Sequence, residues 1–124
     1  VIIRDAATNE VLHRLKGHRE WVRCQAISGD SRRIVTGDDE GMLFLWDADT
    51  GRKVWSKKVG VARLERVALS RDGTTVAYSA MDGSLQVRKL EGGNDPFPLV
   101  GHEISILSAD FSPDGRLLAS AGND

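Results

Sequence analysis

GHREWVRCQAISGDSRRIVTGDDEGMLFLWD, residues 17–47, is the stretch that decides the fold. It contains apolar runs at Val22 to Ile27, at Ile34-Val35 and at Leu43 to Trp46, separated by turn residues at Gly29-Asp30 and at Asp39-Glu40-Gly41. Short apolar runs rich in β-branched and aromatic residues, interrupted by turn residues, are typical of an all-β array of consecutive strands. The stretch therefore predicts at least three neighbouring β-strands.

The same pattern returns along the chain at a period of 42 residues, without an insertion. SGDSRRIVTGDDEG (28–41) aligns with SRDGTTVAYSAMDG (70–83) and with SPDGRLLASAGND (112–124). The apolar columns are Val22, Leu64 and Ile106; Ile27, Leu69 and Phe111; Ile34, Val76 and Leu118; and Leu45, Val87 and Ile3. A fixed period of this length predicts a repeat architecture.

The landmarks of the repeat are Gly-His at 17–18 and 101–102 and Trp-Asp at 46–47. With four strands in about 40 to 45 residues, this pattern resembles the WD40 family, whose repeats form the blades of β-propellers. The resemblance spans all 124 residues and has its most specific motifs in 17–47 and at Gly101-His102. It implies an all-β fold of propeller blades, each with four antiparallel strands.

The repeat divides the chain into four segments. We expect the third and fourth strands of a broken blade in 1–18, a complete blade in 19–60, a degenerate blade in 61–102, and the first two strands of a further blade in 103–124. Propellers need at least about four blades. We therefore expect an incomplete propeller, which is an internal segment of a longer one or closes by self-association through its unpaired blade edges.

Within these segments we expect the outer strand of the degenerate blade at Phe97 to Val100 and the last strand at Arg116 to Ser120. Gly92-Gly93-Asn94 is predicted to be a plain turn, since neither a phosphate-loop pattern nor a following helix accompanies it.

The resemblance also implies a hydrogen-bonded tetrad in each blade, made of the Gly-His histidine, a Ser or Thr on the second strand, an Asp in the next turn, and the Trp-Asp tryptophan. The matching positions of the complete blade are His18, Thr36, Glu40 and Trp46, with Glu40 in place of the family's Asp. The degenerate blade keeps Asp82 alone, and the last segment has His102, Ser120 and Asp124.

The chemistry of such a network favours a structural role. A neutral imidazole donates from one nitrogen and accepts at the other, so it can join a carboxylate to a hydroxyl inside a sheet. A buried polar group left unpaired costs about 1 to 3 kcal/mol. We therefore assign these histidines to stability and predict no catalytic residues.

In propellers of this kind, partners often bind the face that bears the loop before the inner strand and the turn between the second and third strands. The matching positions are Trp21, Arg23, Asp39, Arg63, Glu65, Met81, Ser105, Leu107 and Asn123. Trp and Arg dominate the energy of many interfaces, so Trp21 with Arg23 is our best single candidate. The alternative is that Trp21 packs between two blades.

Composition excludes several other classes of site. The 17 basic and 18 acidic residues are intermixed and give a net charge of −1, which argues against nucleic acid as a partner. No apolar segment approaches the roughly 20 residues of a membrane span. The acidic run Asp38-Asp39-Glu40 lacks the alternating ligands of a calcium loop. His13 has no second ligand at metal-site spacing. We therefore expect no metal and no cofactor.

The single cysteine, Cys24, is expected to be a packed thiol, and the lack of a possible internal disulfide favours a reducing compartment such as the cytoplasm.

We therefore predict a non-catalytic scaffold that binds other proteins or peptides. Two alternatives stay open from the residues. One is a sensing or regulatory arm of a multidomain protein with a kinase or a nucleotide-switch ATPase elsewhere. The other is an enzymatic propeller, a hydrolase or dehydrogenase, which would need catalytic or metal-binding groups converging in the channel. Fold does not fix function in any of these cases.

Overall fold

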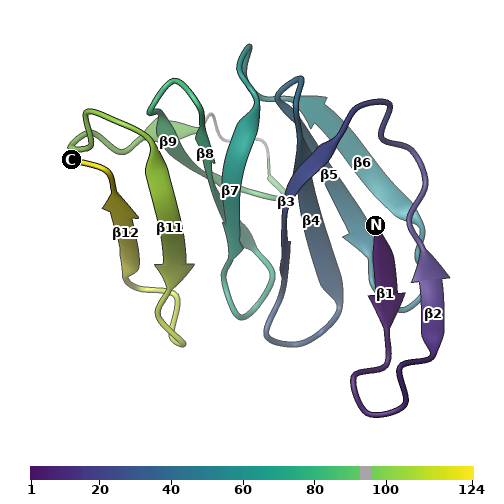
Figure 1. The fold of residues 1–124 in the computed structure, drawn as a ribbon. Coiled ribbons are helices and arrows are strands. Elements are labelled where there is room, and N and C mark those ends of the chain that lie inside the picture. Colours follow the sequence, from purple (N-terminus) through teal and green to yellow (C-terminus); the bar gives the residue numbers. More distant parts are fainter. Residues whose placement is uncertain (93–95) are drawn as a thin grey trace.

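The computed structural model describes residues 1–92 and 96–124, so the predicted turn at Gly92-Gly93-Asn94 lies mostly outside the described residues. The described part consists of twelve strands joined by turns and loops. They form four antiparallel sheets that follow one another along the chain and fan out side by side (Figure 1). The predicted fold class, all-β with four-stranded antiparallel units, is confirmed.

The first sheet pairs β1 (Ile2–Arg4) with β2 (Val11–Arg14). The second sheet has the order β3-β4-β5-β6, with β3 (Val22–Ile27), β4 (Arg33–Asp38), β5 (Met42–Asp47) and β6 (Lys53–Lys58). The third has the order β7-β8-β9-β10, with β7 (Leu64–Leu69), β8 (Thr75–Ala80), β9 (Leu85–Lys89) and β10 (Phe97–Pro98). The fourth pairs β11 (Ile106–Phe111) with β12 (Leu118–Gly122).

Two strand predictions need correction. The outer strand β10 ends at Pro98 rather than Val100, and it forms ladder pairs with two residues of β9. Prolines at 96 and 98 supply no backbone donor, which limits the ladder at this edge. The last strand begins at Leu118 rather than Arg116, because the turn after β11 closes through hydrogen bonds from Leu117 N to Ser112 Oγ and from Ser112 N to Leu117 O.

The sheets bury their faces against one another rather than around a single central core. One cluster lies between the sheets of β3–β6 and β7–β10 and includes Val35, Leu45, Leu64 and Val76. A second cluster, with Leu15, Ile34, Phe44 and Trp46, joins the first sheet to the second. A third, with Ala77 and Val87 against Phe111 and Leu118, joins the third sheet to the fourth. The middle strands are therefore covered on both sides, as their continuous apolar runs predict.

Close approach between sheets depends on small residues. Gly37 on β4 is buried, and a Cβ at this position would lie 2.8 Å from both the Cys24 Sγ and the Leu64 Cδ1. Because real Cβ contacts do not reach this distance, a larger residue would push the second and third sheets apart.

The two ends of the strands form two different surfaces. We call upper face the end with the loops that lead into β3, β7 and β11 and the turns β4–β5 and β8–β9 (Figure 1). The lower face bears the turns β3–β4, β7–β8 and β11–β12. The inner strands β3, β7 and β11 lie next to one another between these two faces.

The turn of the complete blade on the lower face contains a strained residue. Ser31 has φ 61°, at the repeat position where Gly73 has φ 67° and Gly115 has φ 71°. A side chain in the left-handed region costs about 1 to 2 kcal/mol, whereas glycine adopts it freely.

We expect Ser31→Gly to stabilise the propeller by about 0.5 to 1 kcal/mol, since relief of strain exceeds the added entropy of the unfolded chain. Denaturant unfolding of the full-length protein measures the change. Ser31→Val is the matched control and should destabilise, because a β-branched side chain fits this conformation poorly. A loss of stability in Ser31→Gly would contradict the assigned strain.

Candidate functional site

A buried polar network centres on His18 in the complete blade. His18 Nδ1 lies 2.8 Å from Asp38 Oδ2, and His18 Nε2 lies 2.6 Å from Thr36 Oγ1. Trp46 Nε1 donates to the same hydroxyl oxygen at 2.9 Å. Because a carboxylate only accepts, Nδ1 carries the proton, and the Thr36 hydroxyl donates to Nε2 while it accepts from Trp46. Each polar atom of this histidine network, made of His18, Thr36, Asp38 and Trp46, therefore has a partner.

The prediction that Glu40 supplies the carboxylate of this network was wrong. Asp38 occupies that place, and its second oxygen accepts from the backbone N–H groups of Glu40 at 3.1 Å and Met42 at 3.0 Å. Side chains two residues apart on a strand share a face, so Asp38 at the end of β4 points to the same side as Thr36. Glu40 lies in the turn and is exposed. Asp38 is the last residue of β4, whereas Glu40 lies two residues beyond the end of the strand. Both have the same parity as Thr36, so alternation alone does not distinguish them.

The last sheet brings together the three predicted residues of its network. His102 Nδ1 lies 2.8 Å from Asp124 Oδ1, and His102 Nε2 lies 3.0 Å from Ser120 Oγ. The other carboxylate oxygen of Asp124 accepts from Glu103 N at 2.8 Å. The repeat position of Asp38 is Gly122 here, so the carboxylate comes from two residues further along the chain. The hydrogen bond from His102 is the largest of the effects that lower the pKa of Asp124.

The degenerate blade has a different polar contact, which was not predicted from the sequence. Tyr78, at the repeat position of Thr36, is buried and donates from its hydroxyl to Gln86 Oε1 at 2.8 Å. Burial raises the pKa of Tyr78, so the phenol stays protonated. Asp82, the one residue predicted to remain from the network, accepts from Ser84 N at 3.0 Å within its own turn and has no histidine partner among the described residues.

The remaining histidine and the cysteine make local contacts within the sheets. His13, predicted to pack rather than bind metal, makes a 2.7 Å hydrogen bond between its Nε2 and the carbonyl oxygen of Asp49. Cys24 is buried beside the Leu64 carbonyl, and desolvation raises its pKa to about 12. The part of the chain that the structure describes has no group of three or more side chains arranged to hold a metal ion. It also contains no helix with the length and hydropathy to cross a bilayer.

The upper face repeats one backbone contact in the second, third and fourth sheets. Asp39 N donates to Trp21 O at 3.1 Å, Met81 N to Arg63 O at 3.0 Å, and Asn123 N to Ser105 O at 3.1 Å. These six positions belong to the predicted partner-binding set. The hydrogen bond joins the loop before each inner strand to the following turn, so the structure brings the two predicted elements of each unit together.

The other three predicted residues lie at irregularities of the inner strands. The register shifts between Val22 and Cys24, between Leu64 and Arg66, and between Ile106 and Ser108. The unpaired residues in these bulges are Arg23, Glu65 and Leu107. A bulge redirects the side chain of the extra residue, and here it does so at the end of the strand next to the upper face.

Trp21 and Arg23 form the most distinctive group on this face. The Trp21 side chain is 72% exposed, so it does not pack between blades. The guanidinium carbon of Arg23 lies 5.2 Å from the centroid of the Trp21 ring. Arg23 also donates from Nε and Nη2 to the two carboxylate oxygens of Asp39, at 2.5 and 2.9 Å. This hydrogen bonding lowers the pKa of Asp39 and fixes the guanidinium beside the ring.

The remaining predicted residues extend this face across the next two units. Arg63 Nε donates to Glu65 Oε1 at 2.7 Å. Met81 and Leu107 are exposed apolar residues. Arg66, which was not predicted, donates from Nε to the carbonyl oxygen of Leu107 and so links two inner strands.

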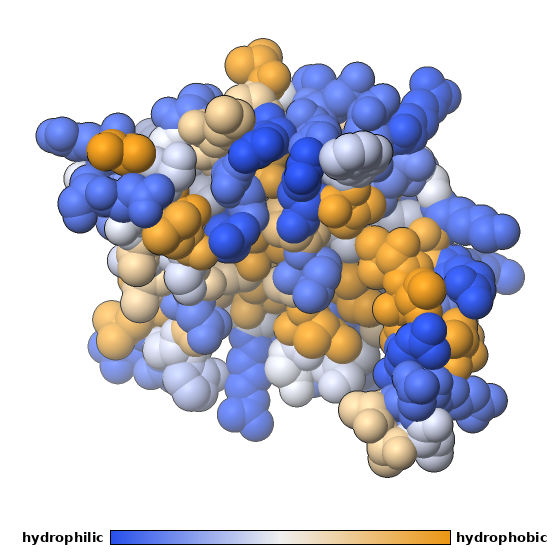
Figure 2. Space-filling model, in the orientation of Figure 1, coloured by the Kyte–Doolittle hydropathy of each residue, from blue (hydrophilic) through white to orange (hydrophobic). Residues whose placement is uncertain are grey.

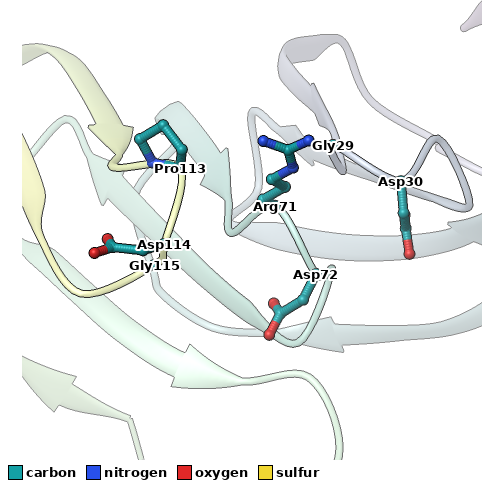
Figure 3. A pocket seen from close by; sticks show the side chains of 7 residues that line it. All are labelled: Gly29, Asp30, Arg71, Asp72, Pro113, Asp114 and Gly115. Carbon is teal, nitrogen blue, oxygen red and sulfur yellow. The ribbon is translucent and has the colours of Figure 1, made fainter.

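The lower face has a hollow of about 500 Å³ between the β3–β4, β7–β8 and β11–β12 turns (Figure 3). Its carboxylates come from Asp30, Asp72 and Asp114, each of which accepts hydrogen bonds within its own Ser-x-Asp turn. These bonds lower the pKa of all three, that of Asp72 to about 2. In Figure 3 the Arg71 side chain extends between Gly29 and Pro113, and Asp30 and Asp72 point away from it. The three carboxylates therefore stabilise their own turns by hydrogen bonding.

Comparison with known families gives a match to WD40, described as "WD domain, G-beta repeat", over residues 9–47 and 95–124. These segments together make up more than half of the chain. The chain is 36% identical over 99 residues to WD repeat-containing protein SL1-17 of Schistosoma mansoni, covering 80% of this chain and 33% of the relative. It is 41% identical over 107 residues to the human angio-associated migratory cell protein, covering 86% and 24% respectively.

A third relative is a guanine nucleotide-binding protein subunit beta of Nicotiana tabacum, 29% identical over 118 residues that cover 88% of this chain and 32% of the relative. The chain thus spans about a quarter to a third of the length of these relatives. Among solved structures, the RRP9 WD40 repeats have a TM-score of 0.77 at 18% identity, over 86% of this chain and 34% of that one. The U3-55K structure has a TM-score of 0.75 at 19% identity, with the same coverage. At these identities the likeness is one of fold.

Asp38 and Glu40 can be separated by substitution. We expect Asp38→Ala to lower the free energy of unfolding by about 1 to 3 kcal/mol, because it leaves His18 and two backbone N–H groups unpaired. Glu40→Ala, which removes an exposed carboxylate two residues away, should change it by less than about 0.5 kcal/mol. Denaturant unfolding of the full-length protein gives both values. A larger loss in Glu40→Ala than in Asp38→Ala would restore the original assignment.

Cys24 should react slowly in the folded protein. With the pKa raised from 9.0 to about 12, its thiolate fraction near neutral pH falls on the order of 1000-fold. Mass spectrometry of the peptide that contains Cys24, after timed alkylation with iodoacetamide, should show labelling mainly upon unfolding. Alkylation in the native protein as fast as in denaturant would contradict the burial of this thiol.

Proposed function

Since the chain belongs to the WD40-repeat family, whose propellers generally serve as scaffolds for protein interactions, we propose that it binds other proteins or peptides through the upper face around Trp21. The observation that carries this proposal is the exposure of Trp21 next to the fixed Arg23–Asp39 pair. Exposed tryptophan is costly to leave in water and is common among the residues that dominate binding energy. Here the Arg23 guanidinium lies against the ring, 5.2 Å from its centroid.

The geometry of the pair adds to this argument. Both nitrogens of Arg23 that face Asp39 are occupied by its two carboxylate oxygens. A partner that covers Trp21 would therefore exclude water from a charge pair that is already complete, which avoids the penalty of burying an unpaired charge. A rigid aromatic side chain also loses little conformational entropy on binding.

We propose that the chain itself is non-catalytic. In support, His18 and His102 are engaged with a carboxylate and a hydroxyl each, and His13 with a backbone carbonyl. A general base needs a free nitrogen within reach of a substrate. An intracellular location stays a proposal, supported by the single cysteine.

Trp21→Ala tests the proposal in the full-length protein. We expect capture of native partners to fall at least about tenfold, as for residues that dominate an interface, with the melting temperature unchanged because the side chain is exposed. Val54→Ala is the matched control, since Val54 is an exposed apolar residue on β6. Quantitative mass spectrometry of captured proteins is the measurement. Equal capture of every partner by Trp21→Ala and the natural protein would refute this site.

A further inference from the structure

Four of the exposed apolar side chains of the upper face come each from a different loop or turn. They are Trp21 before β3, Val61 before β7, Met81 in the β8–β9 turn and Ile104 before β11, with exposed fractions of 72%, 94%, 57% and 51%. We call these four residues the apolar arc. Figure 2 shows isolated apolar side chains among hydrophilic ones along the upper edge of the molecule. Trp21 and Met81 are among the positions predicted from the sequence, whereas Val61 and Ile104 are not.

Backbone contacts connect the members of the arc from one sheet to the next. The β4–β5 turn is bonded to Trp21 through Asp39 N, and it packs so closely on the loop before β7 that a Cβ on Gly41 would lie 2.6 Å from Gly60 O. That loop carries Val61. Two residues later, Arg63 O accepts from Met81 N at 3.0 Å. The contact is looser at the next step, where a Cβ on Gly83 would lie 3.5 Å from Ile104 O.

The charges beside the arc show what can cover it. Among the described residues of the second half of this face, Arg63 pairs with Glu65. Arg66 donates to the carbonyls of Leu107 and Glu65, which are neutral, so it keeps its positive charge on the inner strand β7. Asp82 follows Met81 and Glu103 precedes Ile104, and both carboxylates are exposed and outside any ion pair within residues 1–92 and 96–124. The charged residues that directly flank Met81 and Ile104 along the chain are therefore both acidic.

The Trp21 end of the arc is electrostatically balanced. Glu20 precedes Trp21, and together with Glu40 it lines a cavity of about 340 Å³ that also contains Arg19 and Lys53. Arg23 is neutralised by Asp39. Lys58, which is exposed, precedes the loop that carries Val61. The attraction for cations of a partner is thus confined to Asp82 and Glu103, while Trp21 contributes apolar contact.

We propose that the apolar arc binds a segment of a partner protein in which large apolar residues alternate with lysine or arginine. The apolar side chains cover Trp21, Val61, Met81 and Ile104, and the cations face Asp82 and Glu103. Apolar burial supplies affinity, and complementary charge sets orientation and rejects acidic segments. This inference rests on the proposed function and adds the chemistry of the partner.

The test uses the full-length protein and three fluorescein-labelled synthetic peptides of equal length. One combines leucine with lysine, one has the same leucines with glutamate, and one has serine in place of leucine with the same lysines. Fluorescence polarisation measures Kd. We expect the leucine–lysine peptide to bind at least about tenfold more tightly than either of the others, and its affinity to fall as salt rises, since exposed charges are screened.

Two substitutions locate the binding. Glu103→Gln should weaken the leucine–lysine peptide about two- to fivefold, the range of an exposed charge pair. Met81→Ser should weaken binding of this peptide more than Glu103→Gln does, because it removes apolar contact. Glu10→Gln removes the same charge from the exposed β1–β2 turn and is the matched control, which should leave Kd unchanged.

The outcomes separate this inference from the proposed function. Equal or tighter binding of the leucine–glutamate peptide, no binding of the leucine–lysine peptide, or equal effects of Glu103→Gln and Glu10→Gln would each overturn the partner chemistry. In all three cases the proposed function would stand as long as Trp21→Ala still loses its native partners. Loss of no native partner by Trp21→Ala would remove the proposed function instead.

Discussion

Face-to-face burial between neighbouring sheets is the constraint on which this structure depends. A four-stranded sheet of this size has two apolar faces and cannot cover either of them alone. Val35 and Leu45 are buried because they share one apolar cluster with Leu64 and Val76 of the next sheet. Gly37 marks how tightly the sheets meet. Each sheet is thus a part of a stack, and the stability of one unit includes the surface of its neighbours.

The histidine network is the polar counterpart of this packing. The ring of His18 lies 3.7 Å from that of Phe44, centroid to centroid, and Phe44 stacks on Trp46 at 5.6 Å. The network therefore connects the upper loop to the apolar face of its own sheet. The third sheet manages without it, through Tyr78 and Gln86. Hydrogen bonding at this position is needed because the hydroxyl is buried, whereas the identity of the partners can change.

Much of the fold could be predicted from the sequence, because a period of 42 residues repeats both the apolar columns and the turn residues. The predicted strand bounds differ from the observed ones by at most about two residues. The largest differences are at β10, which lies beside prolines, and at β12, where the preceding turn closes on Ser112. The carboxylate of the histidine network was misplaced, since alignment across repeats selected Glu40, which lies in the turn, whereas His18 bonds Asp38 at the end of β4. The exposure of Trp21 was left open, because sequence gives its residue type but not which side of the loop it takes. Val61 and Ile104 were missed, since loop residues have no periodicity to mark them.

The recurring bulge at the start of each inner strand has a consequence for how such a surface can diversify. Arg23, Glu65 and Leu107 are a cation, an anion and an aliphatic residue at equivalent places, and the neighbouring ladder is the same in all three. Because the extra residue stands outside the paired register, its chemistry is uncoupled from the interior. Repeats that share one architecture can therefore differ in the residue type at this position. Binding selectivity can change there with little effect on the stability of the sheet.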